Sequence, residues 1–463
     1  MQKIFDETES LDQRCYHEFE LSEDILMEHA ADGMREYIAA HFNTGHSVLI
    51  VCGSGNNGAD GIALARILHG TYAVSVYLPY GVKSPMAQLQ LRRAEKVGVS
   101  VCKTLSAADI VIDALFGTGF SRSFDAPTAS LLQRLNALSA VKISCDVPSG
   151  LHRDGSLESA VFHADITLCM GALKRSMFSD AAKDVVGSVH VIDLGVSRAV
   201  YETPSNWNLL EADDIKLPHR HRHNTHKGSF GHLGIICGEK QGAAMIAGRA
   251  AFRFGAGLVT LLSNENVQLP DELMQSHLLP STTTALAVGM GLGNEFSDCE
   301  LQAHLNHTLP LILDADIFAH PLFPSLLQRR NIILTPHPKE FTTVLKKCGI
   351  ADIDIATLQR DRFSYVEQFC RHYPHAVLLL KGANVIIGYG TYFYINPLGS
   401  NCLAKGGSGD VLSGLIGSLL AQGYAPLDAA IHASLAHTLA ARTFSQNSYA
   451  LTPQTLIESI ATL

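Results

Sequence analysis

Gly406-Gly407-Ser408-Gly409-Asp410 is followed at once by the apolar run Val411-Leu412-Ser413-Gly414-Leu415-Ile416-Gly417-Ser418-Leu419-Leu420. Glycines let backbone N–H groups approach a ligand closely, and the apolar run predicts a buried helix over 411–420. The positive end of that helix faces the glycines, which is an arrangement that binds phosphate. Asp410 would repel a phosphate, but it fits as a base or orienting group for a hydroxyl that attacks a phosphoryl centre. The alternative is a tight turn in which Asp410 only caps the helix.

Strand-like runs alternate with helix-like segments along the whole chain. The strand-like runs lie at 47–53, 73–80, 108–117, 141–150 and 164–171, and again at 232–238, 257–263, 285–291, 309–316, 331–337, 376–382 and 384–390. Helix-like segments such as 61–68 and 126–132 separate them. This alternation is typical of βαβ units, so we predict an α/β fold with mostly parallel sheets.

A segment without periodic pattern lies between the two halves. Residues 201–225 contain Pro204, Pro218 and an alternating His-Arg tract. A chain of 463 residues is too long for one ordinary core. We therefore predict two domains, 1–204 and 205–463.

Composition narrows the class of protein. The net charge is −9 and no long basic run is present, which argues against nucleic acid as a partner. The ten cysteines are scattered without a CxxC pair, which is typical of free thiols in a reducing cytosol. The first residues are polar, and no apolar stretch is long enough to span a bilayer. We expect a cytoplasmic protein without a membrane partner.

Three loops at predicted strand ends in the first half carry polar side chains. They are 53–61, Asp113 with Gly117-Thr118-Gly119, and Asp146-Val147-Pro148-Ser149-Gly150. The first is not a GxGxxG dinucleotide fingerprint, because two asparagines occupy its interior. The carboxyl ends of parallel strands meet at one edge of a sheet, so the loops are expected to converge there. Oxygens of Asn57, Asp113 and Ser149 could ligate a hard cation, or Asn57 and Asp113 could only brace loops through Asx turns.

The first half resembles a known family. NNGADG (56–61), DALFGTGFSR (113–122) and DVPSGL (146–151), preceded by Leu26-Met27-Glu28-His29-Ala30, are together similar to the NAD(P)H-hydrate epimerases over most of residues 1–200. The resemblance implies a Rossmann-like three-layer domain with a parallel sheet, in which Asn57, Asp113 and Ser149 bind potassium. It also implies a hydrate pocket formed by Asn56, Asn57, Gly58, Ala59, Asp60, Gly117, Thr118, Gly119, Phe120, Ser121, Arg122, Ser123 and Asp146.

Asp146 is the catalytic carboxylate that this resemblance implies. Ring opening and direct loss of the hydroxyl are both compatible with one carboxylate at the carbon that is inverted. One departure from the family lies at Ala59, where glycine is usual. The added methyl is tolerated if φ is negative there, and it is destabilising if the turn needs a positive φ.

The second half resembles another family. HKGSFGHLGIICG, GRAAFRFGAGLV, GMGLG (289–293), LDAD (313–316), LTPHPKEF (334–341), LLLKGANVII and NCLAKGGSGDVLSG follow one another between residues 209 and 463. Together they look like the ADP- or ATP-dependent NAD(P)H-hydrate dehydratases, which have a ribokinase-like α/β fold. The whole chain therefore resembles the family in which an epimerase and a dehydratase are fused.

This second resemblance implies roles for residues at predicted strand ends. The nucleotide would be held by Lys381, Gly382, Ala383, Asn384, Val385 and Gly409, with Mg²⁺ accompanying ADP. The hydrate would contact Ala243, Gly291, His337 and Asp410. Lys381 follows a buried strand, where such sheets place binding residues, and His337 lies between Pro336 and Pro338 in a restricted loop.

The chemistry that follows is a phosphorylation that drives a dehydration. The hydroxyl of a hydrated nicotinamide is a poor leaving group, and phosphorylation would convert it into phosphate, which the ring nitrogen can expel. Asp410 would orient or deprotonate that hydroxyl, while backbone amides of Gly407 to Gly409 would stabilise the moving phosphoryl oxygens. The partners are then the hydrates of NADH and NADPH and ADP, and we expect a homo-oligomer. The alternative is a ribokinase-like small-molecule kinase with an N-terminal domain that only binds a nicotinamide metabolite.

Overall fold

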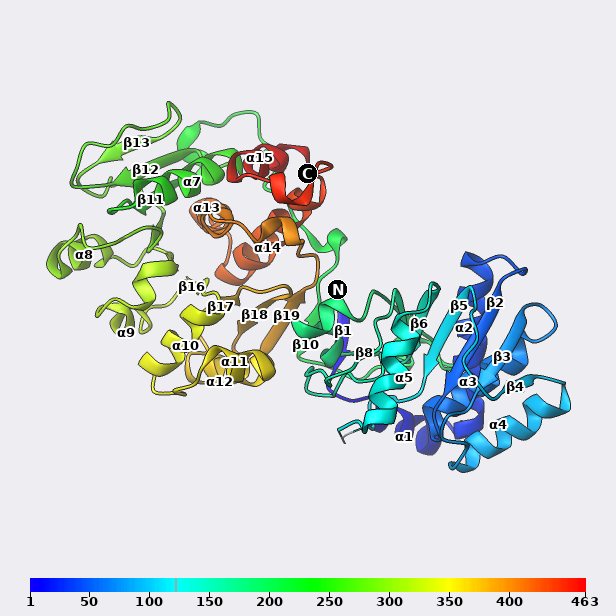
Figure 1. Ribbon diagram of the computed structural model, residues 1–463. Coiled ribbons are helices and arrows are strands. Elements are labelled where there is room, and N and C mark those ends of the chain that lie inside the picture. The colour runs from blue at the N-terminus through cyan, green and yellow to red at the C-terminus, as the bar shows by residue number, and fades with distance from the viewer. Residues whose placement is uncertain (121–122) are drawn as a thin grey trace. The chain divides into compact units, whose positions relative to one another are not determined.

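The computed structural model describes residues 1–120 and 123–463, and the chain divides into two compact units (Figure 1). One unit is Lys3–Ser205, and the other comprises Met1–Gln2 and Asn206–Leu463. Both units are built on parallel sheets flanked by helices.

The first unit contains a seven-stranded parallel sheet in the order β4-β3-β2-β5-β6-β7-β9. Its strands are β2 (Ser47–Cys52), β3 (Ala73–Tyr77), β4 (Ser100–Cys102), β5 (Ile110–Ala114), β6 (Val141–Cys145), β7 (Ile166–Met170) and β9 (Ser188–Ile192). In addition, β1 (Gln2–Phe5) pairs in parallel with β8 (Leu173–Lys174). Strands β2, β5 and β6 are neighbours, so the loops that follow them leave the same edge of the sheet.

Alternation along β2 explains the layers of this unit. Val48 and Ile50 belong to a core shared with helices α1 to α4, whereas Leu49 and Val51 belong to a core on the other face with α5. Successive side chains of a strand point to opposite faces, so a strand that is apolar throughout must be covered on both. The helices are α1 (Glu9–Glu18), α2 (Glu23–His41), α3 (Asn56–Leu68), α4 (Pro85–Lys96), α5 (Ala126–Asn136) and α6 (Arg198–Tyr201), with 3₁₀ turns at Arg175–Phe178 and Ala181–Asp184.

The second unit has a larger sheet. Strands β13-β12-β11-β14-β15-β16-β17 are parallel, β18 and β19 continue the sheet in antiparallel pairing, and β10 lies parallel to β19. The strands are β10 (Trp207–Leu209), β11 (His232–Ile236), β12 (Leu258–Leu262), β13 (Met274–Ser276), β14 (Ala285–Val288), β15 (Leu311–Leu313), β16 (Ile332–Leu334), β17 (Ala376–Leu380), β18 (Val385–Tyr389) and β19 (Tyr392–Asn396).

Helices cover both faces of this second sheet (Figure 1). One core joins β11, β14 and β17 to α7 (Gln241–Arg253), α13 (Ser408–Ala421), α14 (Pro426–Arg442) and α15 (Pro453–Ser459). The remaining helices are α8 (Asp298–Leu305), α9 (Phe323–Leu326), α10 (Pro338–Lys347), α11 (Ile355–Arg360) and α12 (Arg362–His372), and 3₁₀ turns lie at Ala212–Asp214, Lys227–Phe230, Ala315–Phe318, Asn401–Leu403, Ser448–Ala450 and Ile460–Thr462. The central helix α13 is the predicted apolar helix, and it is buried along nearly its whole length.

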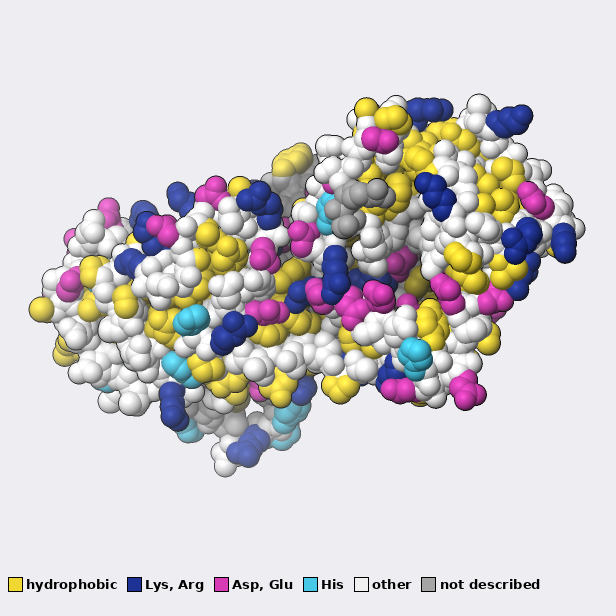
Figure 2. Space-filling view, turned by 90° about the horizontal axis from the view of Figure 1, so that it is seen from below, with side chains coloured by type: hydrophobic (Ala, Val, Ile, Leu, Met, Phe, Trp, Pro, Cys, Tyr) yellow, Lys and Arg dark blue, Asp and Glu magenta, His cyan; other side chains and the backbone are white. Residues whose placement is uncertain are grey.

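The predicted fold class is confirmed, with two α/β units and a parallel sheet in each. Every strand-like run of the sequence contains a strand, although each strand is shorter than its run. Figure 2 shows acidic and basic side chains interspersed on the face that it presents, so the charge there is mixed rather than gathered in one area. Within the described ranges, no helix is both long and apolar enough to cross a membrane.

Candidate active sites

The three polar loops of the first unit converge, as their strand ends predict. Ser149 donates from its backbone N–H and its hydroxyl to the two carboxylate oxygens of Asp113, at 2.8 and 2.7 Å, and its Oγ accepts the N–H of Phe116 at 3.0 Å. A Cβ at Gly117 would lie 3.6 Å from Asn57 and 3.5 Å from Asp146 Oδ2. The loops after β2, β5 and β6 therefore form one site at the carboxyl edge of the sheet.

Asp113, Ser149 and Asn57 offer a carboxylate, a hydroxyl and an amide group in this loop cluster. Asp113 is fully buried, and burial raises the pKa of its carboxyl to about 6 despite its bonds to Ser149. The amide nitrogen of Asn57 is also buried, and it has no hydrogen-bond partner in the described part of the chain. A hard alkali cation is a ligand type that such an oxygen set suits, because it would neutralise the buried carboxylate.

Asp146 is held in an unusual backbone conformation. It directly follows β6, and its φ of 72° lies in the left-handed region, which is uncommon for a residue other than glycine. Its Oδ1 accepts a hydrogen bond from Lys174 Nζ at 2.6 Å and from the Met170 N–H at 3.2 Å. Strained backbone of this kind is often found at functional sites, where the surrounding contacts maintain it.

Lys174 is the buried partner of Asp146. Its side chain is 2% exposed, and its Nζ also contacts the Met170 carbonyl at 3.1 Å and Cys169 Sγ at 3.5 Å. Burial alone would lower the pKa of Lys174, but the carboxylate of Asp146 raises it above its ordinary value. The pair is therefore an ion pair inside the protein, with the lysine charged.

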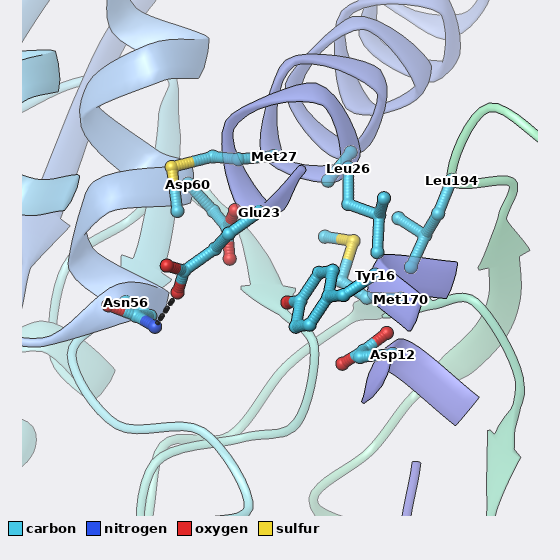
Figure 3. Close-up of a pocket in the computed structure, with 10 residues that line it drawn as sticks. Asp12, Tyr16, Glu23, Leu26, Met27, Asn56, Asp60, Met170 and Leu194 are labelled. Carbon is cyan, nitrogen blue, oxygen red and sulfur yellow. Dashed lines mark hydrogen bonds between the residues drawn. The ribbon is translucent and has the colours of Figure 1, made fainter. Parts of the chain in front are cut away.

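A cavity of about 120 Å³ opens beside Asp60, between helices α1, α2 and α3 (Figure 3). Its polar wall consists of Asp12, Tyr16, Glu23, Asn56 and Asp60. Its apolar wall consists of Leu26, Met27, Ala30, Met170 and Leu194. The side-chain amide of Asn56 donates to Glu23, and both groups lie at the start of their helices.

The carboxyl groups of this cavity influence one another. Burial, and then the charges of Asp146, Asp12 and Glu23, raise the pKa of Asp60 well above its ordinary value. Burial likewise raises the pKa of Asp12, whose Oδ1 accepts the Tyr201 hydroxyl at 2.7 Å. The cavity therefore combines a carboxyl that favours its protonated form with the nearby Asp146–Lys174 ion pair.

The other residues predicted for the hydrate pocket lie around this region. Gly58 and Ala59 are buried in the first turn of α3, and the Ala59 N–H donates to the Gly55 carbonyl. The backbone φ of Ala59 is not positive, so its methyl group is accommodated without strain. Gly117, Thr118, Gly119, Phe120 and Ser123 lie in the loop after β5, and Ser121 and Arg122 lie outside the described residues. No bound ligand tests these contacts, and they stay predictions.

The Gly-rich motif of the second unit begins α13. Gly407 has φ +88°, and a Cβ there would lie 2.5 Å from Pro453, so the position requires glycine. Ser408, Gly409 and Asp410 form the first turn of the helix, where backbone N–H groups have no partner within the helix. Buried His437 supports the turn, because its Nε2 lies 3.0 Å from the Ser408 carbonyl and burial lowers its pKa to about 4. The N-terminus of α13 is thus presented to a ligand by rigid surroundings.

Lys381 reaches this helix start from the end of β17. Its Nζ forms an ion pair with Asp314 at 2.7 Å, and a Cβ at Gly409 would lie 3.3 Å from the same nitrogen. Asp314 follows β15, is 2% exposed, and accepts the Ser413 hydroxyl at 2.6 Å. Gly382 and Ala383 are exposed in the next turn, while Asn384 and Val385 are buried.

Asp410 follows Gly409 in the first turn of α13. Its carboxyl group forms no ion pair within 4 Å with any residue that the structure describes. Burial, and then the neighbouring Asp314 carboxylate, raise the pKa of Asp410 to about 6, although Lys381 acts in the opposite direction. A carboxyl with such a pKa is largely ionised at neutral pH and close enough to neutrality to exchange a proton.

The three other predicted contacts are Ala243, Gly291 and His337. Gly291, with φ +64°, follows β14, and a Cβ there would lie 3.2 Å from the methyl of Ala243 on α7. His337 follows β16 and caps α10, since its Nδ1 accepts the Glu340 N–H at 3.3 Å and its Nε2 lies 3.1 Å from the Glu340 carboxylate. Half of its side chain remains exposed, so the cap leaves one face of the ring accessible.

Sequence reasoning missed the residues that support the two sites. These residues are Lys174, Asp12 and Tyr201 in the first unit and Asp314 in the second. Each of them contacts one of the groups described above. Lys174 had no signal like that of Lys381, because it is the second residue of the two-residue strand β8 rather than the residue after a strand. Asp314 stood in the LDAD motif without an assigned role.

Comparisons with known proteins show the family of this chain. A family model described as NAD(P)H-hydrate dehydratase matches residues 233–462, and one described as YjeF-related protein N-terminus matches residues 23–176. A "Bifunctional NAD(P)H-hydrate repair enzyme Nnr" from Helicobacter pylori is 42% identical over 474 aligned residues that cover 100% of both chains. The protein of that name from Escherichia coli is 31% identical and covers 85% of this chain and 80% of its own.

Among solved structures, an ADP/ATP-dependent NAD(P)H-hydrate dehydratase from Bacillus subtilis co-crystallised with ATP/Mg²⁺ is 27% identical. It covers 55% of this chain and 96% of its own, with a TM-score of 0.47. The full-length similarity to the Helicobacter pylori protein carries the assignment, since it spans both units and both sites. The chain therefore belongs to the family of bifunctional NAD(P)H-hydrate repair enzymes.

Proposed function

We propose that the second unit dehydrates one epimer of hydrated NADH or NADPH at the expense of ADP, and that the first unit interconverts the two epimers. The observation that carries the first activity is the meeting of Lys381, the N-terminus of α13 and Asp410 at one sheet edge. A cation and the N–H groups of a helix N-terminus bind phosphates, and the carboxylate beside them serves an attacking hydroxyl. Family membership supports the pairing of both activities in one chain.

In the dehydration, the residues of this chain position and stabilise the reacting groups. Lys381 and the amides of Gly407 to Gly409 hold the phosphoryl oxygens, with Mg²⁺ supplying charge neutralisation when the nucleotide is bound. Asp410 orients the hydroxyl of the hydrate and accepts its proton as the oxygen attacks. The transfer of the terminal phosphoryl group leaves AMP. Phosphate then leaves as the ring nitrogen donates its lone pair, and loss of a proton from the adjacent ring carbon to solvent restores the reduced nicotinamide.

In the epimerisation, Asp146 is the carboxyl group that faces the substrate. Its position is set by Lys174 and by the left-handed backbone after β6. We propose that Asn57, Asp113 and Ser149 hold K⁺, which supplies a fixed positive charge beside this site. The fit rests on their oxygen-rich chemistry and on the buried carboxylate of Asp113. The test is thermal unfolding of the full chain in KCl and in tetramethylammonium chloride, and equal stability in both salts would contradict a potassium site.

The boundary between the two activities is proposed at residues 204 and 205, which is supported by the division into compact units near that position. All ten cysteines are free thiols, which supports action in a reducing cytosol. The homo-oligomer is a proposal to be tested by light scattering.

The proposed reaction is tested with the purified epimer of NADH hydrate that the dehydratase accepts, with ADP and Mg²⁺. Reduced nicotinamide is followed by absorbance and phosphate by a coupled assay. Equal amounts of NADH and phosphate are expected. A phosphorylated product that accumulates without phosphate release would instead indicate a small-molecule kinase.

A further inference from the structure

The cavity in the first unit is unusually acidic for a site that takes an uncharged ring. Three carboxyl groups, those of Asp12, Glu23 and Asp60, lie on its wall, and none of its described lining residues is Lys or Arg (Figure 3). The nearest buried cation, Lys174, is engaged by Asp146. Carboxylates without cationic partners stabilise positive charge on whatever occupies the space between them.

The apolar part of the lining suits a ring. Leu26, Met27 and Ala30 from α2 and Met170 and Leu194 form an apolar surface. The cavity measures about 120 Å³, close to the ~150 Å³ of a cavity that binds benzene. A hydrated nicotinamide ring could therefore pack against the apolar side and turn its polar atoms toward the carboxyl groups.

Asp60 lines the cavity and Asp146 does not, and the two carboxyl groups differ in their surroundings. Asp146 is paired with a lysine, whereas Asp60 has no cationic partner within 4 Å among the described residues. Burial, and then the charges of Asp146 at the end of β6, Asp12 on α1 and Glu23 on α2, raise the pKa of Asp60, while Lys174 on β8 acts in the opposite direction. Asp60 in turn adds to the effect of burial in raising the pKa of its neighbours Tyr16 on α1, Cys52 on β2 and Cys145 on β6. Burial and the neighbouring carboxyl groups together make Asp60 keep its proton to a higher pH than an ordinary aspartate does.

From this geometry we propose that Asp60 is a catalytic residue of the epimerase, which donates a proton to the departing hydroxyl of the hydrate so that epimerisation passes through a planar ring cation. The proposal rests on the epimerase activity proposed above. It selects direct loss of the hydroxyl over ring opening.

The step is balanced as follows. The bond between the ring carbon and its oxygen breaks, the Asp60 proton passes to that oxygen, and water leaves. The lone pair of the ring nitrogen forms a double bond to the same carbon, which becomes planar. Water then adds to the opposite face, and its proton passes to Asp146, whose negative charge Lys174 has balanced. Proton exchange with solvent restores both carboxyl groups.

The acidic wall distinguishes the two routes. Loss of the hydroxyl creates a full positive charge on the ring, which Glu23 and the newly ionised Asp60 stabilise. Ring opening creates a neutral carbonyl and a neutral amine, which would gain little from a cluster of carboxylates. The charge of the cavity therefore matches the cationic route.

Oxygen isotope exchange tests the route directly. The full-length protein is incubated with one epimer of NADH hydrate in H₂¹⁸O without ADP. The two epimers are then separated, and the ¹⁸O content of each is measured by mass spectrometry. The uncatalysed reaction is subtracted. One ¹⁸O atom is expected in each molecule of the new epimer. A new epimer that retains ¹⁶O would overturn the proposal while leaving the epimerase activity intact. No epimerisation above the uncatalysed rate would instead remove the proposed epimerase function, and this inference with it.

Substitutions test the residue. Asp60→Asn is expected to lower kcat by about 10²–10⁴-fold with little change in KM, the range for loss of a general acid. Asp60→Glu, which keeps a carboxyl, should recover part of that loss. The wild-type rate should fall as the pH rises and Asp60 loses its proton, and Asp60→Asn should lack this dependence.

The matched control is Asp32→Asn, the same change at a half-exposed aspartate of α2 that pairs with Arg35. It should leave the rate unchanged, and the unfolding temperature of each variant shows whether it is folded. A folded Asp60→Asn protein with an unchanged rate or pH profile would contradict the proposal.

Discussion

The two units place a carboxylate at the same kind of sheet edge and control its charge in different ways. Asp146 forms an ion pair with a buried lysine and has a left-handed backbone conformation. Asp410 lies in the first turn of a helix and forms no ion pair with a described residue. The lysine near Asp410 is instead engaged by Asp314, whose charge helps to raise the pKa of Asp410 to about 6. The comparison shows two ways to place a carboxyl group at a sheet edge, one beside a direct cationic partner and one buried beside a like charge.

The largest expected effect is at Asp410. Asp410→Asn should lower the rate of dehydration by about 10²–10⁴-fold, because the amide can orient a hydroxyl but cannot accept its proton. The rate of epimerisation should be unchanged, since its site lies in the other unit. Both rates are measured on the same preparation. An equal loss in both would show that the substitution had disturbed the fold rather than the chemistry.

The next effect concerns the direct partner of Asp146. Lys174→Met removes the cation from a buried ion pair, which should destabilise the first unit by about 3 kcal/mol and abolish most epimerisation. Denaturant-induced unfolding measures the stability of the first unit, and the rate at which the two epimers interconvert measures the activity. Lys103→Met, at an exposed lysine of the same unit, is the control and should change neither. A stable, active Lys174→Met protein would show that Asp146 does not depend on its lysine partner.

The indirect control of Asp410 predicts a pH dependence. A base must be deprotonated, so kcat/KM for dehydration should rise with pH and level off above a midpoint of about 6. Because the folded-state pKa is raised above the unfolded value, this group lowers stability as the pH rises through the same range. A rate that is flat between pH 5 and 8, roughly the range that spans this midpoint, would exclude Asp410 as the base.

Removal of Asp314 sharpens the same comparison. Asp314→Asn should move the midpoint for Asp410 to lower pH, because a like charge is lost and Lys381 is released. It should also raise KM for ADP by about tenfold, equivalent to ~1.4 kcal/mol, since Lys381 is no longer held in place. Asp352→Asn, an exposed aspartate of this unit, is the control. An unchanged midpoint would mean that Asp314 only supports the structure.

The smallest expected effect is at Ala59. This residue lies in α3 with no positive φ and is fully buried, so Ala59→Gly should destabilise the first unit by about 1 kcal/mol through backbone entropy. Epimerisation should be unchanged. A gain in stability would show that the position is strained, as a turn that requires glycine would be.

The polar residues at the ends of the strands could be predicted from the sequence. Asp113, Asp146 and Ser149 converge because parallel strands place their carboxyl ends together, and Lys381 lies at such a strand end. Asp410 is brought there instead by the first turn of α13. The role of Lys174 could not be predicted, because its partner lies 28 residues away and its burial depends on how β8 packs. The short strands β4 and β13 also escaped prediction, since three residues are too few to show a pattern.

The acidic cavity was hidden for a similar reason. Asp12 and Glu23 lie on two amphipathic helices, where acidic residues ordinarily face solvent. Only the packing of α1 and α2 beside α3 brings them to Asp60. A pattern of residues along the chain carries no information on such contacts between helices.

The most direct test of the central claim is recovery of reduced cofactor from racemic NADH hydrate with ADP, Mg²⁺ and K⁺, after subtraction of spontaneous epimerisation. The account predicts that the wild-type protein recovers all of the NADH with an equal amount of phosphate. Asp146→Asn should stop at half, and Asp410→Asn should recover none. Wild-type recovery that stops at half would contradict an epimerase in the first unit, and recovery without phosphate release would contradict the dehydration in the second.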